Sequence, residues 1–142
     1  MTFTYIDYCS VEPLHGPDDA AEYFDTRSAS LKPHGGAGLT IWISPNPDLD
    51  SADPQADAEL RVDVDVEEGR AAVTWLPDGS HAVQLPSTGP IEVMEAEGPV
   101  VTIPADRAVV SVDAARTALI EYTTTGRKPA TLTWTAAERG IH

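Results

Sequence analysis

The segment Ser111–Trp134 constrains the fold most strongly, because it specifies a helix, the end of that helix and a following strand. Ser111 is a natural N-cap, since its hydroxyl can accept a hydrogen bond from a free N–H of the first helical turn. Gly126 can adopt the left-handed conformation that closes a helix, and Pro129 prevents the helix from continuing. This prediction depends on Ser111, Tyr122, Gly126, Pro129 and Trp134.

The rest of the chain alternates short apolar segments with turn residues, and a second helix is predicted from Pro17 to about Ser28. Strands are predicted at Thr2–Tyr8, Leu39–Ile43, Leu60–Glu67, Ala71–Leu76, His81–Leu85, Ile91–Ala96 and Val100–Ile103. We therefore expect one α+β domain, residues 1–142. Its antiparallel, meander-rich sheet should have about six to seven strands, with one helix near each end and both helices on the same face.

Acidic residues dominate the charge, with 23 Asp and Glu against 9 Lys and Arg and a formal net charge of −14. This balance excludes a protein that binds nucleic acid by neutralising phosphates, and it disfavours an anionic membrane surface. A basic protein or a cation is the partner that such a surface suits.

The acidic residues concentrate in a proline-rich loop, residues 44–58, and in the strand that follows it. On that strand, apolar residues alternate with charged ones, so Asp63, Asp65 and Glu67 should form a regular line on one face. The line could imitate a nucleic-acid backbone and bind a basic cleft, or it could be an ordinary solvated face. The candidate partner-binding residues are Trp42, Asp48, Asp50, Asp53, Asp57, Glu59, Asp63, Asp65, Glu67 and Glu68.

No motif predicts a metal or cofactor. Asn46, Asp48, Asp50 and Asp57 match four positions of a calcium-binding loop, but Ser51 stands where that loop needs glycine and no helices flank it. The four histidines show no zinc-ligand spacing; they are His15, His34, His81 and His142.

Catalytic motifs are also missing. Gly35–Gly38 precedes a strand and not a helix, so a flexible turn is favoured over a phosphate-binding loop. Cys9 is favoured as a small packing residue, with a nucleophile activated by a histidine as the alternative. The sequence therefore predicts a non-enzymatic protein without cofactor.

Targeting signals are not apparent. Cys9 is the single cysteine, so no internal disulfide can form, and the N-terminal residues lack the basic and apolar regions of a signal peptide. No apolar run approaches transmembrane length. We expect a cytoplasmic protein.

The helix, the Thr125–Pro129 stop and the strand with Trp134 resemble the closing signature of a bacterial immunity-protein family. It is the first of the numbered immunity families, and its members accompany deaminase-type toxins in polymorphic toxin systems. The hairpin Ala71–Val83 and the Ile103–Pro104 step also fit the pattern. The resemblance covers about residues 60–134 and excludes the first 59.

The resemblance implies an immunity protein that binds a cognate toxin, of the nucleobase-deaminase class, and blocks its basic substrate cleft. Toxin-facing surfaces differ from pair to pair, so the candidate binding residues come from the charge pattern alone. An acidic secretion chaperone or adaptor is the first alternative, and a small enzyme of unrecognised type is the second.

Overall fold

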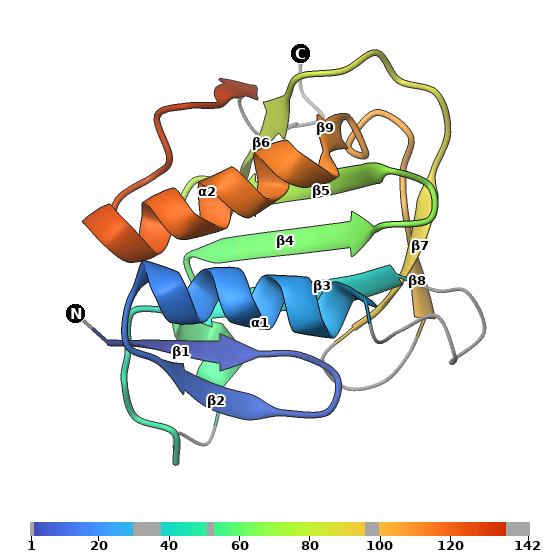
Figure 1. The fold of residues 1–142 in the computed structure, drawn as a ribbon. Helices are drawn as coiled ribbons and strands as arrows, with labels where there is room; N and C mark the ends of the chain where they lie inside the picture. The colour runs from blue at the N-terminus through green and yellow to red at the C-terminus, as the bar shows by residue number, and fades with distance from the viewer. Residues whose placement is uncertain (1, 30–37, 51–52, 96–99, 136–142) are drawn as a thin grey trace.

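The computed structural model describes residues 2–29, 38–50, 53–95 and 100–135 (Figure 1). The helices are α1 (Pro17–Ala29) and α2 (Val112–Thr125), with a short 3₁₀ helix at Pro54–Asp57. The strands are β1 (Phe3–Ile6), β2 (Val11–Leu14), β3 (Gly38–Ser44), β4 (Leu60–Asp65), β5 (Arg70–Trp75), β6 (Ser80–Val83), β7 (Ile91–Met94), β8 (Val100–Ile103), β9 (Val110–Ser111) and β10 (Thr133–Thr135). Ala96, where we predicted the end of one strand, lies outside the described residues.

The strands of the described residues form one sheet in the order β10-β6-β5-β4-β3-β1-β2, and every neighbouring pair in this order is antiparallel. Off this path, β7 pairs in parallel with the beginning of β3, β8 pairs with β7, and β9 pairs with β5. The predicted α+β class is confirmed, but the sheet has ten strands, so the prediction of six to seven is wrong.

Two of the additional strands have weak sequence signals. β2 contains Pro13, which has no N–H to donate to a neighbour and is tolerated because β2 is an edge strand. β9 is only two residues long and pairs with Arg70 and Ala71 of β5. β9 is too short to show a period of two, and Pro13 interrupts the strand pattern of β2.

Both helices lie side by side across the same face of the sheet, as predicted (Figure 1). Their apolar residues pack on a core that includes Ile41 of β3, Val62 of β4 and Val73 of β5. Leu119 of α2 and Phe24 of α1 contribute the helical side of this core. Among the described residues, no helix combines the length and the apolar character that a membrane crossing requires.

A second, smaller cluster covers part of the opposite face of the sheet. Ala72 of β5 packs there with Ile91 and Val93 of β7, Ile103 of β8 and Ala108. The β7–β8 pair therefore shields residues of β4 and β5 that point away from the helices.

The ends of α2 follow the sequence prediction closely. Ser111 caps the helix by accepting a 3.0 Å hydrogen bond from the N–H of Ala114, and Gly126 closes it with φ of 71°. Trp134 then donates a 2.7 Å hydrogen bond from its indole N–H to the carbonyl of Pro129. This bond ties β10 to the chain segment that terminates the helix.

Candidate functional site

In the acidic loop, residues 44–58, the structure describes 44–50 and 53–58, and hydrogen bonds around Asn46 connect these two parts. The Asn46 side chain accepts from the N–H of Asp48 at 3.0 Å and donates to a carboxylate oxygen of Asp57 at 2.9 Å. Its carbonyl accepts from the Thr4 hydroxyl at 2.7 Å, which anchors the loop to β1. Asp48 in turn accepts from the N–H of Asp50 at 3.0 Å. The loop thus presents exposed carboxylates from a locally fixed backbone, namely those of Asp48, Asp50, Asp53 and Asp57.

Asp63 on β4 is buried, so the predicted line of solvent-facing carboxylates is wrong at this position. One of its oxygens accepts from the Thr40 hydroxyl at 2.8 Å, and both accept from Nε of Arg61 at 3.1 Å. Burial raises the pKa of the Asp63 carboxyl, and the charge of Arg61 opposes that shift. Asp63 is a structural ion-pair partner inside the protein and does not face solvent.

Asp65 is also buried, which corrects the second position of the predicted line. One carboxylate oxygen accepts from the N–H groups of Glu67 and Glu68, both at 3.1 Å, and the Asp65 carbonyl accepts from the N–H of Gly69. Asp65 therefore stabilises the turn between β4 and β5, and only Glu67 and Glu68 carry exposed carboxylates there.

The acidic candidates form two separate surfaces. The acidic loop precedes β4 at Leu60, whereas Glu67 and Glu68 follow its last residue, Asp65 (Figure 1). A strand of this length separates its ends by about 17 Å. The two surfaces cannot act as the continuous line that the alternating sequence predicts.

Trp42, the candidate interface aromatic, is half-buried and belongs to neither apolar cluster. The guanidinium of Arg61 lies 4.9 Å from the centre of its ring, a distance suited to a cation–π contact. Arg61 also forms a 2.9 Å ion pair with Glu95, and the buried indole N–H of Trp42 has no acceptor among the described residues. Arg61 is the single basic residue among the carboxylates of the β4 sequence, and this is the signal from which the network could have been predicted.

A cavity of about 420 Å³ opens next to this network, between β4, β5 and β8. Thr74, Thr102 and Ile103 line it together with Arg61 and Arg107. The sequence analysis did not single out Arg107, because nothing in the local pattern places it near β4.

His81 lies near the same arginine. Burial lowers the pKa of the His81 imidazole, and the positive charge of Arg107 adds to that shift while Asp106 opposes it. His81 is therefore held toward its neutral form. His34 and His142 lie outside the described residues, as do residues 35–37 of the glycine-rich turn, and Gly38 is the first residue of β3.

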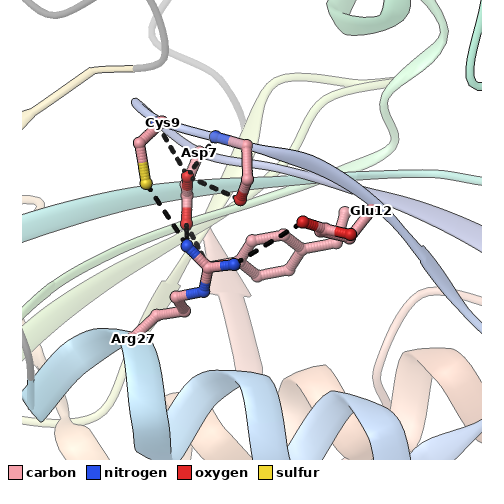
Figure 2. Close-up of polar contacts among 6 residues, drawn as sticks. Asp7, Cys9, Glu12 and Arg27 are labelled. Atoms are coloured by element: carbon pink, nitrogen blue, oxygen red, sulfur yellow. Dashed lines mark hydrogen bonds and ion pairs between the residues drawn. The ribbon is translucent and has the colours of Figure 1, made fainter.

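A polar cluster joins the β1–β2 hairpin to α1 (Figure 2). Asp7 is buried and accepts hydrogen bonds from the Tyr5 hydroxyl at 2.8 Å and from the N–H of Cys9 at 2.9 Å. Arg27 of α1 lies 3.8 Å from the Asp7 carboxylate, 3.7 Å from that of Glu12 and 3.3 Å from the Cys9 sulfur. Cys9 is exposed at the hairpin turn, so its prediction as a packing residue is wrong.

Metal-binding geometry is not present in the part of the chain that the structure describes, which contains no group of three or more His, Cys, Asp or Glu side chains able to hold an ion. The Asn46 and Asp48 side chains of the calcium-like pattern accept hydrogen bonds from backbone N–H groups of the same loop.

The sequence pattern of the immunity protein family Imm1 matches residues 11–136. The chain belongs to this family. The match begins at residue 11, in β2, and includes α1 and the acidic loop, so the expectation that the first 59 residues lie outside the resemblance is wrong. No curated protein shows significant sequence similarity to the chain.

Imm1 membership makes the chain an immunity protein, and the partner of an immunity protein is a toxin. It also favours a binding protein over an enzyme. The surfaces described above are therefore to be considered as docking surfaces, in which exposed side chains and preformed grooves matter more than proton-transfer geometry.

Proposed function

We propose that this Imm1 protein neutralises its toxin in the cytoplasm by inserting the acidic loop into a basic substrate cleft. We further propose that the toxin is a nucleobase deaminase. A deaminase acting on nucleic acid needs an electropositive cleft to hold its substrate. An acidic loop docked in such a cleft would exclude the substrate both sterically and electrostatically.

The observation that carries the proposal is the set of hydrogen bonds within the described residues of the acidic loop, 44–50 and 53–58. Because Asn46 binds both Asp48 and Asp57, the carboxylates are held on one scaffold before any partner arrives. A preformed loop loses less conformational entropy on binding than a flexible one. The net charge of −14 adds long-range attraction to a cationic cleft and raises the association rate.

The same loop offers an apolar contact. Leu49 lies between Asp48 and Asp50 and exposes 41% of its surface. Protection of a cell requires a Kd on the order of 1 nM or below, about −12 kcal/mol, and charge alone rarely provides that affinity. Leu49 supplies apolar area at the centre of the charged surface.

The test compares two variants that each remove two negative charges, one in the loop before β4 and one in the turn after it. Asp48→Asn/Asp50→Asn changes the acidic loop and keeps the side-chain oxygen that accepts from the Asp50 N–H. Glu67→Gln/Glu68→Gln is the matched control at the β4–β5 turn. We expect the loop variant to weaken toxin binding by at least about tenfold, with a smaller salt dependence of the association rate, and the control to change affinity little.

Equal effects of the two variants would show that net charge, and not the loop, governs binding. The cleft-blocking step is tested separately with the cognate toxin, recovered by co-expression of the neighbouring gene, and a single-stranded oligonucleotide. The oligonucleotide and the immunity protein should compete, and a stable ternary complex would contradict the mechanism. A toxin that releases no ammonia from nucleobases would refute the deaminase assignment.

A further inference from the structure

Arg107 is an exception among the basic side chains of this acidic protein. Of the nine Lys and Arg residues in the chain, Lys32 and Arg139 lie outside the described residues. Five of the other seven form ion pairs with carboxylates: Arg27, Arg61, Arg70, Arg116 and Lys128. Arg107 and Arg127 form none among the described residues, and of these two only Arg107 lines a cavity.

The surroundings of Arg107 form a groove and not an open surface. We call this cavity of about 420 Å³ the Arg107 groove; it is lined by Arg61, Asp63, Thr74, Thr102, Ile103 and Arg107 among others. Its volume falls within the usual range of ligand pockets, about 300–1,000 Å³. The lining also includes Glu95, so it carries two arginines and two carboxylates. Arg61 is bonded to both carboxylates, Asp63 and Glu95. Arg107 is the charged side chain of the lining that forms no ion pair among the described residues.

A guanidinium in a groove is best satisfied by a carboxylate, which can accept two parallel hydrogen bonds from it. Thr74 and Thr102 add hydroxyl groups to the lining, and Ile103 supplies apolar surface for the methylene groups of an acidic side chain. Elsewhere the surface of a protein with a net charge of −14 repels carboxylates. Within this acidic surface, the unpaired guanidinium of Arg107 is the group of the groove to which a partner's carboxylate can bond.

The groove and the acidic loop meet at one point in the fold. Leu76 lines the groove, and its N–H donates a 2.8 Å hydrogen bond to the carbonyl of Glu59, which follows the acidic loop. Leu60, the next residue, pairs with Trp75 in the β4–β5 ladder. One partner can therefore contact both surfaces.

We propose that the Arg107 groove receives an aspartate or glutamate side chain of the toxin, whose carboxylate pairs with Arg107. The partner is a toxin because of Imm1 membership, and the contact does not depend on the deaminase assignment or on cleft blocking. Exposed carboxylates in the loop and an unpaired guanidinium in the neighbouring groove admit one docking orientation and reject the reversed one. The groove thus determines the orientation in which the toxin binds, whereas the loop provides the long-range attraction to the toxin.

The first experiment uses the full chain without the toxin. The peptide acetyl-Ala-Asp-Ala-amide is titrated by NMR, with acetyl-Ala-Asn-Ala-amide as the uncharged control. We expect saturable shifts at the amides of Thr74, Thr102 and Ile103 with the Asp peptide only, lost in Arg107→Ala and kept in Arg127→Ala. Absence of saturation up to about 50 mM, or the same response in Arg107→Ala, would overturn the proposal.

The second experiment measures toxin affinity for the same two variants, after circular dichroism has confirmed that both are folded. Arg107→Ala should bind the toxin at least about tenfold more weakly, whereas Arg127→Ala should bind like the parent protein, because Arg127 does not line the groove. Both variants lose one positive charge, so the comparison separates the groove contact from the effect of net charge. Equal losses would overturn the groove as a contact site. If the Arg107 effect holds while oligonucleotide and immunity protein bind the toxin together, the groove remains and the cleft-blocking proposal fails.

Discussion

The hydroxyl of Tyr122 donates a 2.8 Å hydrogen bond to the carboxylate of Glu59 across 63 positions of the sequence. This bond connects α2 to the residue that joins the acidic loop to β4. The Tyr122 ring is buried, and its centre lies 5.1 Å from the centre of the Phe3 ring and 5.5 Å from that of the Trp75 ring. Burial and the bonded carboxylate both raise the pKa of Tyr122, so the hydroxyl stays protonated and remains a donor. Glu59, a candidate for toxin binding from the charge pattern, has a structural partner inside the protein.

Tyr122→Phe should therefore lower the free energy of unfolding by about 1–2 kcal/mol, because a hydrogen bond to a charged group is lost without changing the ring packing. Urea denaturation of Tyr122→Phe, Glu59→Ala and the double variant measures this value and the coupling between the two side chains. If the effects of the two single variants simply add, the side chains do not interact in solution.

Asp63→Ala should cost about 3 kcal/mol of stability, because it leaves the half-buried Arg61 without one of its two carboxylate partners and the Thr40 hydroxyl without its acceptor. Asp50→Ala removes the same charge at an exposed position of the acidic loop, and it should change stability by no more than about 0.5 kcal/mol. Guanidinium denaturation of both variants checks the difference. Similar values would place Asp63 in contact with solvent, as the sequence alternation predicted.

The strand β4 shows how far the sequence alone could go. Its period of two correctly assigned Val62 and Val64 to the core beneath the helices. The alternation says only that the other side chains point the opposite way, and it cannot say what covers them. Asp63 bonds to Thr40 of β3, and β7, which contacts β4, comes from more than 25 positions downstream, so no local pattern encodes its burial. Asp65 is different, because its hydrogen bonds come from the N–H groups of Glu67 and Glu68 in the adjacent turn.

Local capping chemistry was more informative than charge. Ser111 and Gly126 determine the ends of α2 through their own backbone and side-chain preferences, so the sequence located both ends within one residue. Arg107 is the opposite case, since its importance depends on the fold, which leaves it without an ion-pair partner among the described residues. A sequence shows which charges exist, but only the fold shows which of them are paired.

Trp134→Phe tests the bond that closes the C-terminal motif. It removes the 2.7 Å hydrogen bond to the Pro129 carbonyl, and Pro129 is buried, so the expected loss of stability is about 1 kcal/mol. Trp42→Phe is the control, because the Trp42 indole N–H has no acceptor among the described residues and its loss removes no such bond. Thermal or urea unfolding should rank Trp134→Phe as the less stable variant. The reverse ranking would show that the Pro129 contact contributes nothing.

Asp78 provides a prediction about pH. Hydrogen bonds from the Ser80 hydroxyl and N–H, at 2.6 and 2.9 Å, lower its pKa to about 2, and Lys128 contributes a further bond at 3.0 Å. In an unfolded chain the pKa of an Asp carboxyl is about 3.9. Because the folded pKa is the lower one, the stabilisation from Asp78 is complete above pH about 4 and is lost as the pH falls toward 2.

Carboxyl ¹³C NMR should therefore give Asp78 a titration midpoint well below the ordinary value for an Asp carboxyl, about 3.9. Ser80→Ala removes the hydroxyl donor and should raise the Asp78 pKa more than Lys128→Met does, since the Ser80 bond is the largest contribution and the Lys128 pair is exposed. If Lys128→Met produces the larger rise, the ion pair and not the turn hydrogen bonds controls this carboxylate. That result would also make the Lys128 ion pair a stronger link between the β5–β6 turn and the segment that ends α2, since Lys128 contacts both Asp78 and the Trp134 ring.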